Sequence, residues 1–198
     1  MRKFEIILIG CSLGGMRALE TIFSAVPPGF QVPIAVVQHR HKRSNEALPE
    51  FLRKATNLCV VDVEDKQWIK PGCIYLAPAD YHLMVEKGSF SLSVDAAVAY
   101  SRPSIDVMFE SAADAYGSAV LAIVLTGANA DGARGAARIK RRGGFVVVQD
   151  PATAEAPSMP QAAIAAGPVD QILPLDRIGP FVVEMCHKAQ PSRAAGRS

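Results

Sequence analysis

Three residues of this chain have the side-chain types that nucleophilic catalysis requires: Ser12, His39 and Asp131. A serine hydroxyl is a poor nucleophile until a neighbouring imidazole accepts its proton. The imidazole in turn needs a carboxylate that fixes its tautomer and stabilises its charge. We therefore expect Ser12 as nucleophile, His39 as general base and Asp131 as orienting carboxylate, provided that the fold brings the three together.

The sequence around Ser12 predicts a sharp turn between a strand and a helix. The apolar residues 4–9 have the length of a buried strand, and residues 16–26 have the pattern of a helix, which Pro27 ends. Between them, residues 10–14 match G-x-S-x-G, the pattern of a nucleophile elbow, whose glycines let the backbone turn and expose the hydroxyl. Two other interpretations stay open: an anion-binding helix N-terminus, and a dinucleotide-binding turn, which would need glycine in place of Ser12.

His39 and Asp131 also follow predicted strands. His39 comes directly after the apolar residues 33–38, and Asp131 lies in a glycine-rich loop, residues 126–132, after the apolar residues 119–125. In open α/β sheets, ligands bind beyond the carboxyl ends of the strands, so we expect the three side chains to meet at that edge. The chain order Ser, His, Asp differs from the order Ser, acid, His of the α/β-hydrolases. A lipase-type fold is therefore not expected.

Strands and helices alternate along the rest of the chain. This alternation predicts a doubly wound α/β fold: a mostly parallel sheet flanked by helices on both faces, with an antiparallel hairpin at one edge formed by residues 82–86 and 90–94. The other predicted strands are residues 60–64, 72–77, 145–149 and 171–173, and the other predicted helices are residues 45–54, 104–116, 133–141, 161–166 and 177–188.

Composition narrows the class of protein. The 198 residues are 49% hydrophobic and 20% charged, as in ordinary globular proteins, and we expect one domain over residues 1–189 followed by a disordered tail at residues 190–198. No apolar run is long enough to cross a membrane, and a net charge of +2 does not indicate a nucleic-acid partner. The four cysteines form no C-x-x-C pair, which indicates neither a metal site nor a disulfide framework. A reduced, cytoplasmic location is expected.

Seven segments carry a further signal: IGCSLGGMRALE at residues 9–20, VVQH at 36–39, PGCIYLAPADYHL at 71–83, SRPSIDVMFESAADAYG at 101–117, TGANADGARG at 126–135, GGFVVVQD at 143–150 and MPQAAIAAGPVDQILPL at 159–175. In this order they resemble the catalytic domain of the chemotaxis receptor methylesterases, the CheB-type protein-glutamate methylesterases, over nearly the whole chain. The resemblance implies an esterase that removes methyl groups from glutamate side chains on the cytoplasmic helices of chemoreceptors and releases methanol. Some members of the family also deamidate glutamine.

The resemblance also implies roles for residues. It carries the catalytic triad of the family onto Ser12, His39 and Asp131, with neither metal nor organic cofactor. It gives the backbone N–H of Ala128 a part in the oxyanion hole. Leu13 stands on the same oxyanion or substrate side, where the family has a small hydroxylated residue, and Arg102 and Ser104 belong to a substrate-side loop. The alternative for these two residues is a helix entry with Ser104 as its N-cap. The family's receiver domain is not in this sequence, so regulation is expected from a separate regulatory or receiver protein or from a larger parent protein.

Simpler interpretations of the same residues remain. His39 could be a structural histidine or bind metal together with His41, and Asp131 could simply cap the helix that follows it. His82 is expected to be structural. Arg40, Lys42 and Arg43 form either a solvated loop or a positive patch that steers an acidic receptor helix. A non-catalytic module that binds a receptor or another partner is the main alternative function, and a nucleotide-binding domain is a third.

Overall fold

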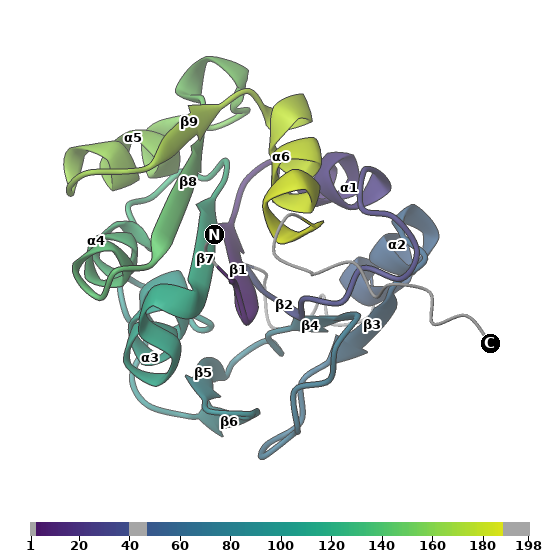
Figure 1. Cartoon of the computed structure of the whole chain (residues 1–198). Coiled ribbons are helices and arrows are strands. Elements are labelled where there is room, and N and C mark those ends of the chain that lie inside the picture. Colours follow the sequence, from purple (N-terminus) through teal and green to yellow (C-terminus); the bar gives the residue numbers. More distant parts are fainter. Residues whose placement is uncertain (1–2, 40–46, 188–198) are drawn as a thin grey trace.

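A computed structural model describes residues 3–39 and 47–187 of the chain (Figure 1). Their main feature is a seven-stranded sheet with the strand order β3-β4-β2-β1-β7-β8-β9, in which all neighbouring strands are parallel. The bounds are β1 Ile6–Cys11, β2 Ile34–Gln38, β3 Cys59–Asp62, β4 Cys73–Leu76, β7 Val120–Val124, β8 Phe145–Gln149 and β9 Gln171–Leu173. The predicted doubly wound α/β fold is confirmed.

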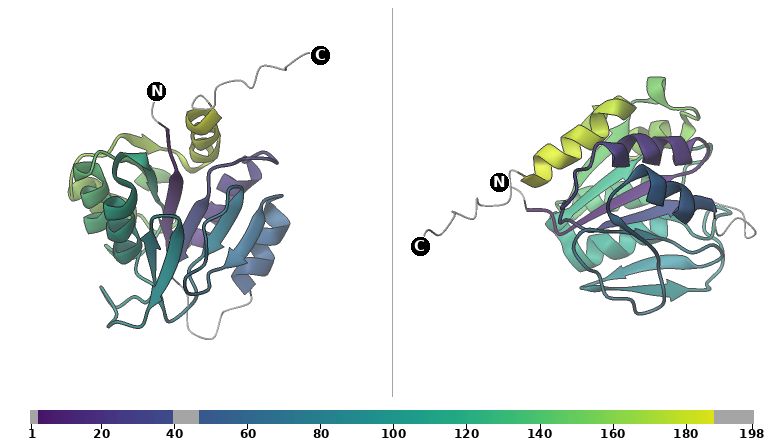
Figure 2. Two further views of the ribbon diagram at one scale, coloured as in Figure 1. Left: turned by 60° about the horizontal axis from the view of Figure 1, so that its bottom comes forward. Right: turned by 90° about the vertical axis from the view of Figure 1, so that its right-hand side faces the viewer.

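Helices cover both faces of this sheet (Figures 1 and 2). Because successive residues of a strand point to opposite faces, Ile7 and Ile9 of β1 join one apolar cluster, whereas Ile6 and Leu8 join the other. The first cluster includes α1 Gly15–Ser24, α2 Ala47–Ala55 and α6 Leu175–His187, and the second includes α3 Ile105–Tyr116, α4 Ala133–Arg141 and α5 Ser158–Ala165. Two 3₁₀ turns complete the helices, η1 Gly117–Ala119 and η2 Pro151–Thr153.

The predicted hairpin is present, but it does not border the main sheet. Strands β5 His82–Glu86 and β6 Ser89–Ser93 form a two-stranded antiparallel sheet of their own. The hairpin uses its apolar side chains to pack beneath α3 and against the sheet. Phe90 lies 4.9 Å from the ring of Tyr75, and Ser111 of α3 accepts a hydrogen bond from the Val85 N–H at 3.0 Å. The hairpin was expected at the edge of the main sheet. It packs against α3 and Tyr75 instead, and these contacts explain its position.

Several boundaries differ from the prediction in ways that matter for the site. Strand β1 continues two residues beyond Ile9, because Gly10 and Cys11 still pair with Val37 and Gln38 of β2. The start predicted for the second helix, residues 44–46, and the predicted tail lie outside the described residues. No helix in the described part of the chain is long and apolar enough to cross a membrane.

Candidate active site

The register of β1 and β2 brings Ser12 and His39 side by side. Cys11 is the register partner of Gln38, and the His39 N–H donates to the Cys11 carbonyl at 3.0 Å. On the other side, the Ser12 N–H donates to the carbonyl of Thr126, two residues beyond the end of β7, at 2.9 Å. Ser12 therefore lies between His39 and Thr126, at about the 4.8 Å spacing of neighbouring strands. All three lie at the carboxyl edge of the sheet.

The backbone after Ser12 has the conformation of an elbow. Gly14 has a φ of 78°, a left-handed conformation that favours glycine, and it stands at the N-cap of α1. A Cβ on Gly15 would collide with the amide oxygen of Gln38, so that position also needs glycine. Within the described residues, no hydrogen bond uses the N–H of Leu13, which directly follows Ser12. The elbow thus leaves one N–H beside Ser12 available for a ligand.

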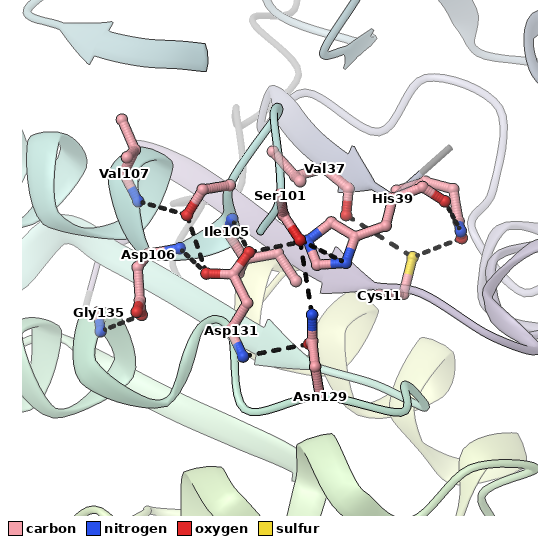
Figure 3. A network of polar contacts seen from close by, with 12 residues as sticks. Cys11, Val37, His39, Ser101, Ile105, Asp106, Val107, Asn129, Asp131 and Gly135 are labelled. Atoms are coloured by element: carbon pink, nitrogen blue, oxygen red, sulfur yellow. Dashed lines mark hydrogen bonds and ion pairs between the residues drawn. The ribbon is translucent and has the colours of Figure 1, made fainter. Parts of the chain in front are cut away.

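His39 is held by Asp131 through one ring nitrogen, and the Ser101 hydroxyl approaches the other (Figure 3). Its Nε2 lies 2.8 Å from Oδ2 of Asp131, and its side chain is 13% exposed. Since an ionised carboxylate only accepts hydrogen bonds, Nε2 carries the proton and Nδ1 keeps the lone pair of a base. The Ser101 hydroxyl lies 3.5 Å from Nδ1. In the described structure no hydrogen bond joins Ser12 Oγ to His39, so the triad is not closed by contact.

Asp131 is fully buried and accepts four hydrogen bonds. Besides His39, the donors are the Ser104 hydroxyl at 2.9 Å and the N–H groups of Ile105 and Asp106 at 2.7 and 3.0 Å. Burial alone would raise the pKa of this carboxyl, but the hydrogen bonds from His39, Asp106 and Ile105 outweigh it, and its pKa lies below the usual value. Asp131 is therefore ionised at neutral pH.

The same contacts correct the simpler interpretation of Asp131. It does not cap the helix that follows it, since the N-cap of α4 is Gly132, without a side-chain cap. Instead it receives the first N–H groups of α3, whose positive helix end favours a carboxylate. The N-cap of α3 is Ser104, whose hydroxyl accepts from the Val107 N–H.

Two residues that the sequence analysis did not single out hold the elbow in place. Gln38 is buried, and its amide N–H groups donate to the carbonyls of Ser12 and His39 at 2.9 and 2.8 Å. The Thr126 hydroxyl donates to the Leu13 carbonyl at 2.9 Å and accepts from the Ala156 N–H at 2.8 Å. A glutamine that ends an otherwise apolar strand is the signal that could have revealed the first of these contacts.

The remaining predicted site residues differ in their surroundings. Leu13 and Ala128 are both exposed, and no hydrogen bond among the described residues uses the Ala128 N–H. Ser104 is fully buried behind Asp131, which corrects its expected place on the substrate side. Arg102 donates to the Asp80 carboxylate and to the carbonyls of Val94 and Asp95, so its guanidinium braces loops. Residues 40–46, with the predicted positive patch, lie outside the described residues.

Two further polar residues, Asn129 and His82, support this edge. Asn129 accepts a hydrogen bond from the Asp131 N–H at 3.2 Å and donates to the Ser101 hydroxyl at 3.5 Å (Figure 3). His82 is buried, with Nδ1 accepting from the Ser104 N–H at 3.2 Å and Nε2 lying 3.1 Å from the Ala96 carbonyl. His82 thus has a structural position rather than a catalytic one, as the sequence indicated.

A serine at an elbow and a histidine–aspartate pair, gathered at the carboxyl edge of a doubly wound sheet, define a class: α/β proteins equipped for serine hydrolase chemistry. Within that class the chain belongs to the CheB methylesterase family, whose sequence model matches residues 7–182. This family membership accounts for the fold and for the types of residue at the site.

Relatives and a solved structure agree with this assignment. A Leptospira interrogans protein named as a putative protein-glutamate methylesterase/protein-glutamine glutaminase is 44% identical over 92% of this chain and 95% of its own length. A Maricaulis maris protein-glutamate methylesterase/protein-glutamine glutaminase is 38% identical over 90% of this chain but only 46% of its own length. The crystal structure of the Thermotoga maritima CheB methylesterase catalytic domain matches with a TM-score of 0.88 and 35% identity, over 92% of this chain and 99% of that one.

Proposed function

We propose that this chain hydrolyses the γ-methyl esters of glutamate side chains on chemoreceptors, with Ser12, His39 and Asp131 as its catalytic triad. The observation that carries the proposal is the orientation of His39: its Nε2 is bound to Asp131, and its Nδ1 is left as a base at the edge where Ser12 is its register neighbour. The enzyme names of the relatives support the reaction. A non-catalytic module is correspondingly not favoured.

In the first half of the reaction, the Ser12 oxygen attacks the ester carbonyl while its proton passes to His39 Nδ1. Asp131 stabilises the imidazolium that forms. The negative charge that develops on the carbonyl oxygen needs donors, and the N–H groups of Leu13 and Ala128 have no other partner in the described structure. Collapse of the intermediate breaks the bond to the methoxy group, which leaves as methanol with the proton from His39.

In the second half, His39 accepts a proton from water, whose oxygen attacks the acyl-serine. The Ser12 oxygen leaves with that proton, so the enzyme is restored and the product is a glutamate carboxylate. A glutamine side chain could enter the same cycle with ammonia as the first leaving group. This would give the deamidation that the names of the Leptospira and Maricaulis relatives include.

Ser101 also approaches His39 Nδ1 and has to be considered as a nucleophile. Its own N–H and carbonyl bond back to Val98 in a tight turn, which is not the start of a helix. Ser12, by contrast, lies at the strand-to-helix elbow before α1, and within the described residues no hydrogen bond uses the N–H of Leu13 that follows it. Hydrogen bonds between catalytic groups are also often long before substrate binds. Ser12 is therefore the better nucleophile.

The partners follow from this function as part of the proposal. The substrate would be a methylated helical segment of a chemoreceptor, and a separate regulatory or receiver protein would control the activity. The proposed reaction itself uses neither a metal nor an organic cofactor.

The experiment is methanol release from a methylated receptor fragment, measured for the wild type and for Ser12→Ala and Ser101→Ala. Release that persists in Ser101→Ala and disappears in Ser12→Ala supports the proposal. Release lost only in Ser101→Ala would transfer the nucleophile to that residue. A folded wild-type protein that releases no methanol, and whose Ser12 does not react with a fluorophosphonate, would refute the esterase.

A further inference from the structure

A tight turn next to His39 has a conformation that its sequence does not favour. Val98 and Ser101 exchange backbone hydrogen bonds of 3.1 and 2.8 Å, and the two residues between them, Ala99 and Tyr100, have φ values of 48° and 63°. Left-handed backbone at two successive positions suits glycine or asparagine, and it is unfavourable for alanine and tyrosine. The turn is therefore maintained against local preference.

The ring of Tyr100 contributes nothing to the folded core. Its exposed fraction is 104%, as great as in an isolated residue, so no side chain among the described residues covers it. A bulky aromatic residue at a strained and fully exposed position has no structural reason to be there. Strained backbone of this kind occurs most often at functional sites.

The turn is nevertheless held firmly beside the site. Ser101, the residue after Tyr100, places its hydroxyl 3.5 Å from His39 Nδ1 and accepts from Asn129 at the same distance (Figure 3). The next residue, Arg102, is fixed by Asp80 and by the carbonyls of Val94 and Asp95. Tyr100 is thus exposed within one residue of a side chain that lies against the catalytic base.

Resting on the function proposed above, we propose that Tyr100 is a specificity-determining residue that packs against the receptor helix bearing the methyl ester. A helix with its side chains is about 10–12 Å wide. A helix that delivers a glutamate side chain to His39 must therefore lie over the residues bordering that histidine. Leu13, 56% exposed, and Met16, 37% exposed, extend the apolar border from the elbow. The expected partner surface is the apolar flank of an amphipathic helix beside the esterified glutamate.

The test compares two variants, each of which relieves the backbone strain at one position of the turn. Only one of them removes the tyrosine ring. Tyr100→Gly removes the aromatic side chain, whereas Ala99→Gly keeps it, and each should raise the melting temperature by about 2 °C because glycine accepts a positive φ. On a methylated receptor fragment, we expect Tyr100→Gly to raise KM roughly tenfold with little change in kcat, as for loss of an aromatic contact. Ala99→Gly should keep both constants, and Tyr100→Phe should retain the wild-type KM.

The following outcomes would overturn the proposed role of Tyr100. An unchanged KM in Tyr100→Gly, or an equal rise in Ala99→Gly, would overturn the role of the ring. A fall in kcat alone would show instead that the turn positions His39, which also contradicts the inference. A folded wild-type protein that releases no methanol, and whose Ser12 does not react with a fluorophosphonate, would refute the proposed function, and this inference with it, before any variant is compared.

Discussion

Replacing Asp131 with asparagine tests both functions of this carboxylate, because the change keeps the shape of the side chain and removes its charge. The carboxylate oxygens accept from His39 and Ile105 on one side, and from Ser104 and Asp106 on the other. An amide has only one accepting oxygen. Its NH₂ group must therefore face either the Ile105 N–H or the Asp106 N–H, and that N–H loses its partner in either orientation.

The cost can be worked out for stability and for rate separately. One buried N–H without a partner costs about 1–3 kcal/mol of unfolding free energy. For catalysis, the missing attraction is that between the carboxylate and the imidazolium in the transition state. At about 4 Å and an effective dielectric constant of about 20, this attraction is about 4 kcal/mol, which corresponds to about a 10³-fold loss in kcat. If the NH₂ group faces His39, Nε2 has to accept a hydrogen bond and the ring proton moves to Nδ1. His39 then has the wrong tautomer for a base, and the loss in kcat is greater.

Asp106→Asn is the matched control. Asp106 is a second buried aspartate, in the first turn of α3, but its carboxylate accepts from the Gly135 N–H at 2.7 Å rather than from His39. An amide oxygen can keep that bond. We therefore expect methanol release within about threefold of the wild type for Asp106→Asn. If Asp131→Asn keeps kcat within tenfold while folded, the assignment of Asp131 to the base is wrong.

The two aspartates should also respond to pH with opposite signs. The pKa of Asp131 is lowered, so its ionisation stabilises the fold above its unfolded pKa of about 3.9, and this contribution is lost as the pH falls through the lower folded-state pKa. The pKa of Asp106 is raised, chiefly by burial, so its contribution is present below about pH 3.9 and is lost as the pH rises through the folded-state pKa.

Urea unfolding at pH 7 and at about pH 3 measures this difference. Relative to the wild type, Asp131→Asn should be less stable at pH 7, with a gap that narrows in acid. Asp106→Asn should gain stability relative to the wild type as the pH rises from 3 to 7, because asparagine avoids burying a charge. Parallel pH profiles for the two variants would contradict both assignments.

Further predictions concern the groups that hold the elbow. Gln38→Leu removes the amide that donates to the carbonyls of Ser12 and His39, so we expect a loss of about 2 kcal/mol of unfolding free energy in urea and a lower kcat. Unchanged values for both would exclude Gln38 as a brace. Thr126→Val removes the hydroxyl that joins the Leu13 carbonyl to the loop of Ala156, and we expect it to lower the unfolding free energy by about 1–3 kcal/mol. Thr126→Ser keeps a hydroxyl and should retain most of the wild-type stability. Equal losses in the two Thr126 variants would indicate a role for the methyl group instead.

The sequence was sufficient to predict the fold class and the sheet edge at which Ser12, His39 and Asp131 lie. It was not sufficient to predict the contacts that position them there. Apolar strands that end in Ser12, His39 or the loop of Asp131 indicated one common edge, because the carboxyl ends of parallel strands lie together. The register that sets Ser12 beside His39 depends on pairings between strands that are far apart in the chain. Local patterns do not contain that information.

The contacts of Asp131 with the start of α3 and the place of the hairpin were not predicted for the same reason. A carboxylate just before a helix suggests a cap for that helix. Here, however, the donors belong to α3, which lies 25–27 residues earlier in the chain. The hairpin was recognisable from its turn, yet its docking beneath α3 depends on tertiary contacts such as that of Phe90 with Tyr75.

These long-range contacts explain how a fully buried carboxylate can serve the base. Removing Asp131 from water disfavours its charge, and a neutral acid could not stabilise an imidazolium. The start of α3 compensates, since its first N–H groups and the Ser104 hydroxyl replace the lost water molecules as donors. The bond to His39 adds a fourth donor and fixes the ring. Because Oδ2 of Asp131 accepts from both the Ile105 N–H and His39, we expect a movement of the start of α3 to change the orientation of the proposed catalytic base as well.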